Sequence, residues 1–123
     1  MILVADDEAP ITTALQLLFD LNGLPAEVAH SPAETLARVV RGGVTLVVHD
    51  LNFSRGETGG ADGIALFRAL RKVAPGLPVV VMTSWPAQRT ATLLAGEGVS
   101  AYLMKPWDDA ELVALVRRFQ AGR

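Results

Sequence analysis

Short apolar runs alternate with amphipathic stretches five times along the 123-residue chain, and this alternation constrains the fold more than any other feature of the sequence. Strands that alternate with helices are typical of an α/β domain with a parallel sheet. Right-handed crossovers in a doubly wound five-stranded sheet favour the strand order 2-1-3-4-5, which places the third strand centrally. The apolar runs predict strands at Ile2 to Ala5, Ala26 to Ala29, Val44 to His49, Pro78 to Thr83 and Ala101 to Met104.

Capping and turn residues mark the helices between these strands. Ser31 and Pro32 open the second helix, and Glu34 is placed to close a capping box. The other amphipathic stretches predict helices at about Ala9 to Leu21, Gly63 to Val73, Pro86 to Ala95 and from Asp108 onward. In the first of these, 3.6-residue periodicity predicts an apolar stripe of Ile11, Leu15, Leu18 and Leu21.

Length and composition indicate one domain over residues 1–123. Half of the residues are hydrophobic, yet no apolar run approaches the roughly 18 residues of a membrane span. The net charge is −2 and Lys and Arg do not cluster, which argues against direct nucleic-acid binding. The chain has no cysteine, and MILVADDE lacks the basic start of a signal peptide, so we expect a cytoplasmic protein without membrane association.

Polar side chains follow four of the predicted strands. The first ends in Asp6-Asp7-Glu8, the third in Asp50, the fourth in Thr83-Ser84 and the fifth in Lys105-Pro106. Parallel strands end at one edge of a sheet, with neighbours about 4.8 Å apart, so the acids of the first strand and the hydroxyl of the fourth should flank Asp50. The fifth strand is two spacings away, and only a long side chain such as lysine reaches back.

Carboxylates gathered this closely need a cation, since two unit charges 4 Å apart repel by about 4 kcal/mol at an effective dielectric of 20. Oxygen donors without histidine or cysteine suit Mg²⁺. A carboxylate nucleophile, a divalent ion, a lysine and a hydroxyl are the groups needed to accept a phosphoryl group and hold its oxygens.

In these motifs the chain resembles, over essentially its whole length, a receiver domain of bacterial two-component response regulators, with their CheY-like, flavodoxin-like fold. Asp6 and Asp7 match the family's acidic pair, Asp50 its phosphoacceptor, Thr83 its hydroxyl and Lys105 its lysine. The stretches DLNFSRGETGGADG and KPWDDAEL look most like receivers of sigma-54-dependent, NtrC-type transcription activators. We therefore expect the chain to be a fragment of a longer protein whose output domain lies elsewhere.

The resemblance implies a Mg²⁺ site and names its ligands. Asp7 and Asp50 would bind the ion directly, the backbone carbonyl of Asn52 would complete the protein ligands, and Asp6 would assist through water.

The resemblance also implies a signalling role and not a stand-alone enzyme. Asp50 would take a phosphoryl group from the phosphohistidine of a sensor histidine kinase, and Thr83 and Lys105 would bind its oxygens. Thr83 would then move and Tyr102 would fill the space, which alters the face of helix 4, strand 5 and helix 5. That face would pair with a second receiver or act on an output domain or downstream protein. The Lys105-Pro106 bond is cis in the family.

The sequence departs from the family at two places. The glycine-rich stretch NFSRGETGGA separates Asp50 from Asp62-Gly63 by several extra residues. Trp85 is bulky for a position that borders the path of the hydrolytic water, so we expect it to slow loss of the phosphoryl group.

Two other functions compete with the receiver interpretation. Asp50-Leu51-Asn52-Phe53-Ser54 loosely resembles the DxDxT motif of haloacid dehalogenase-type phosphatases, although Asn52 replaces the acid/base aspartate and the acidic pair would be out of place. A receiver-like scaffold that never carries phosphate is the second alternative. Residue by residue, Tyr102 fits an ordinary half-buried strand position equally well, and His30 and His49 fit packing or surface positions.

Overall fold

The computed structural model describes residues 1–53, 61–84, 94, 97, 99 and 101–121. Its five parallel strands have the order β2-β1-β3-β4-β5, as the sequence predicts. The strands are β1 (Ile2–Ala5), β2 (Ala26–Ala29), β3 (Leu46–Asp50), β4 (Val79–Thr83) and β5 (Ala101–Met104).

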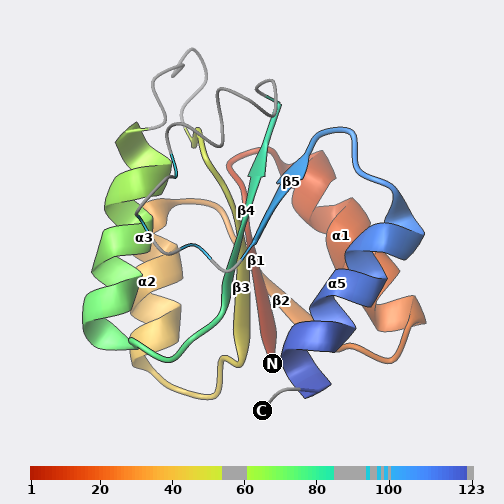
Figure 1. Cartoon of the computed structure of the whole chain (residues 1–123), viewed down its shortest axis with the longest axis horizontal. Coiled ribbons are helices and arrows are strands. Elements are labelled where there is room, and N and C mark those ends of the chain that lie inside the picture. Colours follow the sequence, from red (N-terminus) through yellow and green to blue (C-terminus); the bar gives the residue numbers. More distant parts are fainter. Residues whose placement is uncertain (54–60, 85–93, 95–96, 98, 100, 122–123) are drawn as a thin grey trace.

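Helices cover both faces of this sheet (Figure 1). One face carries α1 (Ala9–Leu21) and α5 (Asp109–Ala121), and the other carries α2 (Pro32–Val40) and α3 (Ala61–Val73). None of the helices among the described residues has the length and hydrophobicity that a membrane span requires. The predicted helix at Pro86 to Ala95 lies outside the described residues except for Leu94, and so do Trp85 and most of the glycine-rich stretch.

The apolar core lies in two layers, one on each side of the sheet. Leu46 and Val48 of β3 pack into the layer under α1 and α5, whereas Val47 packs into the layer under α2 and α3. All five residues of β3 are buried. A central parallel strand covered on both faces needs apolar residues on both, which explains why β3 does not alternate.

Several boundaries differ from the predicted ones by one or two residues. β3 begins at Leu46 instead of Val44, and Gly42 and Gly43 turn the chain a few residues earlier with φ of 91° and 87°. β3 also includes Asp50, which pairs in register with Met82. Three further elements begin one or two residues from their predicted starts: α3 at Ala61, β4 at Val79 and α5 at Asp109, where the Asp108 carboxylate caps the Glu111 N–H at 2.9 Å.

The predicted stripe of α1 is wrong at one position. Leu21 is 75 % exposed, whereas Phe19 is fully buried. Phe19 follows the buried Leu15 by four residues, about one helical turn, and therefore lies on the same face, while a spacing of six turns Leu21 away.

The second helix begins with the predicted cap in a modified form. The Ser31 hydroxyl accepts a hydrogen bond from the Glu34 N–H at 3.1 Å. The Glu34 carboxylate accepts from the N–H of His30 at 3.3 Å, one residue earlier than the capping box predicts.

Gly63 in the first turn of α3 lies directly against the chain that leaves β3. Its N–H donates to the carbonyl of Leu51 at 2.9 Å. A Cβ at Gly63 would lie 2.3 Å from that oxygen and 2.6 Å from the Leu51 Cα. Only glycine permits this approach between the helix and the residue after Asp50.

We expect Gly63→Ala to lower the free energy of unfolding by about 1–3 kcal/mol, because the new methyl group overlaps backbone that cannot rotate away. Urea unfolding measures the change. Gly76→Ala is the matched control, since a Cβ there has no atom within 4 Å. Equal stability of the two variants would contradict the close approach.

Candidate functional site

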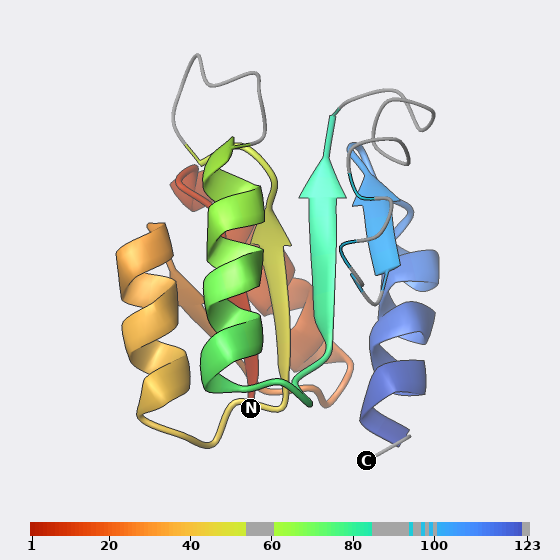
Figure 2. The same cartoon turned by 60° about the vertical axis from the view of Figure 1, so that its left-hand side comes forward.

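The polar residues at the strand ends form one cluster at the carboxyl edge of the sheet. Asp50 and Thr83 are the last residues of β3 and β4, whose arrowheads point to the same end in Figure 2. Asp6 follows β1 and Lys105 follows β5. Open parallel sheets place their sites at this edge, where the connections leave the strands.

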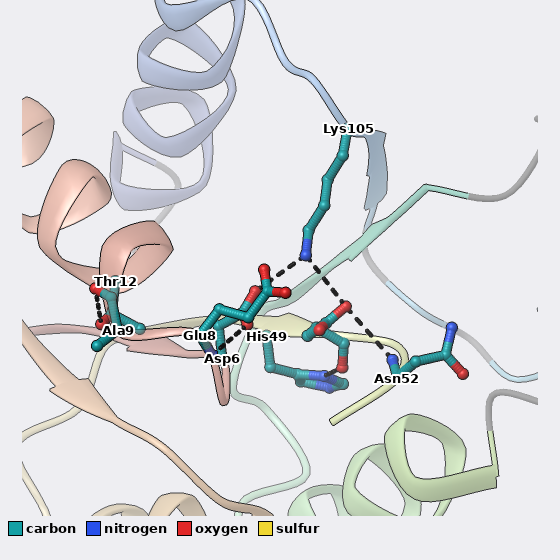
Figure 3. Close-up of polar contacts among 8 residues, drawn as sticks. Asp6, Glu8, Ala9, Thr12, His49, Asn52 and Lys105 are labelled. Carbon is teal, nitrogen blue, oxygen red and sulfur yellow. Dashed lines mark hydrogen bonds and ion pairs between the residues drawn. The ribbon is translucent and has the colours of Figure 1, made fainter. Parts of the chain in front are cut away.

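Lys105 spans the distance from β5 to β3. Its Nζ lies 3.0 Å from Oδ2 of Asp6 and 3.5 Å from Oδ1 of Asp50 (Figure 3). Burial lowers the pKa of its ammonium group, but the carboxylates of Asp50 and Asp6 outweigh that effect and raise the pKa. Lys105 is therefore a permanent positive charge between two acids.

The three acids can reach one another. Asp6, Asp7 and Asp50 offer carboxylate oxygens that lie within 4.8 Å of one another. Asp6 is fully buried and Asp50 is 6 % exposed, whereas Asp7 faces solvent. Burial, together with the charge of Asp6, raises the pKa of Asp50 to about 6 despite Lys105. The same two causes raise the pKa of Asp7.

Backbone N–H groups orient two of these carboxylates. The Glu8 N–H donates to Oδ1 of Asp6 at 2.9 Å, and the Asn52 N–H donates to Oδ1 of Asp50 at 3.3 Å. In both cases the donor follows the acid by two residues, as in an Asx turn. Each turn holds its carboxylate at the point where the chain leaves the strand.

Thr83 and Lys105 are joined through the backbone at the ends of β4 and β5. The Lys105 N–H donates to the carbonyl of Thr83 at 2.7 Å, and Thr83 is buried. The Lys105-Pro106 peptide bond is cis, as the resemblance implies. Tyr102 lies on the edge strand β5, is 38 % exposed, and is in register with Val81.

His49 contacts the site, although the sequence predicted only a packing or surface residue. It is fully buried, its ring stacks on Phe53 with centroids 5.9 Å apart, and its Nδ1 lies 2.8 Å from the backbone oxygen of Asp50. Burial lowers its pKa to about 4, although the bond to the Asp50 carbonyl opposes this change. A polar residue directly before Asp50 in an apolar strand is the signal that could have found it.

The donor set fits a magnesium ion. The cluster combines buried and solvent-facing carboxylates, and burial together with repulsion from Asp6 keeps the pKa of Asp50 raised despite Lys105. A hard divalent ion bound by a few carboxylates and waters would relieve that repulsion. Asp50 combines partial access with a fixed ammonium group beside it, which suits a nucleophile for an anionic phosphoryl donor.

Comparison with known families agrees with this geometry. The family described as "Response regulator receiver domain" matches residues 2–117. The receiver domain of NtrX from Brucella abortus has a TM-score of 0.85 and 27 % identity, with 97 % of each chain covered. A two-component response regulator from Clostridium difficile has a TM-score of 0.84 at 22 % identity, covering 98 % of this chain and 94 % of the other, which supports the fold.

Similar curated proteins are longer regulators of transcription. "Transcriptional regulatory protein GlrR" of Escherichia coli K12 is 33 % identical over 107 residues, or 87 % of this chain and 23 % of that protein. "DNA-binding transcriptional regulator NtrC" of the same strain is 30 % identical over 115 residues, 94 % of this chain and 24 % of the relative. The chain thus spans about a quarter of the length of these relatives. The predicted resemblance to NtrC-type regulators is confirmed.

Proposed function

Because the chain belongs to the response regulator receiver domain family, we propose that it accepts a phosphoryl group on Asp50 and thereby switches a signalling surface. One observation carries this proposal: the carboxylates of Asp6, Asp7 and Asp50 meet, and the Lys105 ammonium group lies beside those of Asp6 and Asp50. The role is that of a signalling domain that acts on itself, and no turnover of a separate substrate is expected.

We assign the metal ligands from the same cluster. Asp7 and Asp50 would hold Mg²⁺ together with the backbone carbonyl of Asn52, and Asp6 would act through water. When bound, the ion would neutralise the crowded carboxylates and the incoming phosphoryl oxygens.

In the reaction, a carboxylate oxygen of Asp50 attacks phosphorus while the P–N bond of the donor phosphohistidine breaks. The imidazole of the kinase leaves with the bonding electron pair. Lys105 stabilises the negative charge on the phosphoryl oxygens, and Thr83 holds one of them after transfer. Asp50 must be ionised to attack, so its raised pKa reserves the reaction for pH above about 6 unless a cation lowers that pKa.

The switch follows from the added charge. Phosphorylation places more negative charge and strong acceptor oxygens at the edge of the sheet. Thr83 moves toward the phosphoryl group and Tyr102 turns inward. These movements shift the balance between two conformations of the surface formed by β5 and α5. Tyr102 is 38 % exposed on the edge strand β5, so its side chain starts partly outside the core.

The partners follow from the family. Response regulators pair with histidine kinases and carry output domains, and we propose the same for this chain, with residues 1–123 as a single receiver domain. A transcriptional output fits the relatives, and the phosphorylated surface could also pair two receivers.

Intact mass spectrometry tests the proposal directly. The chain and its Asp50→Asn variant are incubated with Mg²⁺ and acetyl phosphate, which supplies the phosphoryl group and releases acetate. We expect the wild type to gain one phosphoryl group and the variant none. Omitting Mg²⁺ should abolish the gain in the wild type.

Two results would overturn the proposal. A gain by both proteins would place the acceptor elsewhere. No gain by a wild type that binds Mg²⁺ in calorimetry would favour a scaffold that works by protein contacts alone.

A further inference from the structure

His49 is fully buried beside Asp50, and the proposed function gives it no role. Its Nδ1 lies 2.8 Å from the backbone oxygen of Asp50, and its ring stacks on Phe53 at an interplanar angle of 29°. Its other nitrogen, Nε2, is buried and has no hydrogen-bond partner among the described residues.

These contacts determine the tautomer of the ring. A carbonyl oxygen only accepts hydrogen bonds, so the Nδ1 of His49 carries the proton. In the neutral ring Nε2 is then a bare acceptor, and a buried acceptor without a donor destabilises the fold. A leucine of similar size would avoid this cost. What histidine adds at this position is therefore the N–H to Asp50.

The hydrogen bond from His49 holds the carbonyl of the Asp50-Leu51 peptide group, which β1 does not pair with. Pairing of β3 with β1 ends at the Ala5 and His49 pair, so no β1 residue lies opposite Asp50. The N–H of the same peptide, that of Leu51, donates to the Met82 carbonyl at 2.9 Å. His49 thus anchors the carbonyl end of the peptide while β4 anchors its N–H end.

The anchored peptide sets the geometry of the acceptor. Asp50 is the first residue of this peptide, so its side chain is attached directly to it. The next N–H along the chain, that of Asn52, donates to Oδ1 of Asp50. If the peptide rotates, the carboxylate and the carbonyl of Asn52 move with it. Stacking on Phe53 holds the imidazole in the orientation that prevents such rotation.

We propose that His49 is a positioning residue that holds the Asp50-Leu51 peptide in the conformation needed for phosphoryl uptake and Mg²⁺ binding at Asp50. This inference rests on the proposed function, because it concerns how readily the same carboxylate reacts.

Two substitutions separate the hydrogen bond from packing. His49→Leu fills the site without a donor, and His49→Asn places an amide N–H near the position of Nδ1. Val47→Ala, two residues earlier in β3, removes buried atoms without touching the Asp50 carbonyl and is the matched control for lost stability. All are studied at a temperature at which urea unfolding shows each protein to be folded.

Two quantities are measured: the rate of phosphoryl uptake from acetyl phosphate by intact mass, and the Mg²⁺ dissociation constant by calorimetry. We expect His49→Leu to slow uptake and weaken Mg²⁺ binding by about 3- to 10-fold, the worth of one hydrogen bond. His49→Asn should recover most of both losses, and Val47→Ala should match the wild type.

Nitrogen NMR of the wild-type imidazole gives a readout that does not depend on activity, and we expect the proton on Nδ1 of His49. A proton on Nε2 instead would overturn the inference, as would a His49→Leu variant that behaves like Val47→Ala while the wild type is phosphorylated normally. If the wild type takes up no phosphoryl group, the proposed function fails and the positioning role fails with it. That failure is visible in the wild type alone, before any variant is compared.

Discussion

Lys105→Met should lower the free energy of unfolding at pH 7 by about 2–4 kcal/mol when no divalent ion is present. Methionine replaces the apolar part of the lysine side chain but leaves Asp6, which is fully buried, without the ammonium group 3.0 Å away. Removing one partner of a buried ion pair leaves an uncompensated charge, which costs about 3–5 kcal/mol in a fully buried pair. We take a lower range because 18 % of the Lys105 side chain is exposed.

The loss should depend on pH in a definite direction. Lys105 lowers the pKa of Asp50, so that pKa rises further when the ammonium group is lost, and acid then protonates Asp50 and removes part of the unpaired charge. The difference between variant and wild type should therefore shrink from pH 7 toward pH 4.5 in urea unfolding. Lys72→Met, at an exposed position of α3, is the matched control. A loss that is equal at both pH values would contradict the ion-pair explanation.

Asp50→Asn should have the opposite effect and stabilise the fold by about 2 kcal/mol at pH 7 without Mg²⁺. The folded-state pKa of Asp50 is raised from 3.8 to about 6, chiefly by burial and then by the charge of Asp6. A difference of one in pKa between the folded and unfolded states corresponds to about 1.4 kcal/mol, and we reduce the resulting value of about 3 kcal/mol for partial solvent screening.

The sign follows from proton binding. Between about pH 4 and pH 6 the folded chain binds more protons at Asp50 than the unfolded chain, so wild-type stability falls as pH rises through this range. Asparagine does not titrate, so the advantage of the variant should be absent below pH 4 and full above pH 7. Unfolding curves at pH 4 and pH 7 measure it. Mg²⁺ should reduce the difference in free energy of unfolding between the variant and the wild type at pH 7, because only the wild type has the Asp50 carboxylate to bind the ion.

A variant that is less stable than the wild type at pH 7 would show that the carboxylate of Asp50 is well accommodated without a metal ion. The expected result has another meaning: the group proposed to accept phosphate destabilises the fold that carries it. The proposed phosphoryl transfer needs the Asp50 carboxylate in its charged form. Lys105 offsets only part of the free energy that this buried charge costs the fold.

Sequence reasoning succeeded where local pattern and topology determine position. The strand order followed from five alternating elements and right-handed crossovers, and it is confirmed. The meeting of Asp6, Asp7 and Asp50 followed from parallel strands ending at one edge, and the structure brings their oxygens within 4.8 Å. The roles assigned to these residues, and to Thr83, stay predictions.

Packing decided what the pattern left open. Asp6 and Asp7 are adjacent and identical in the sequence, yet Asp6 is fully buried and Asp7 is exposed. Phe19 takes the core position predicted for Leu21. Such differences depend on which side chains the neighbouring elements cover, and a single sequence does not contain that information locally.

Hydrophobic periodicity and strand-end chemistry thus determined the fold class and the members of the acidic cluster, because both depend on spacing along the chain. The tertiary structure decided how charge is shared within the cluster and that His49 holds the Asp50 carbonyl. β4 lies between β5 and β3, so the Lys105 side chain must extend past the end of β4 to reach the acids. Its Nζ then lies 3.0 Å from Asp6 and 3.5 Å from Asp50. Distances of this kind arise from the packing of elements far apart in sequence, and they control the pKa values on which the chemistry depends.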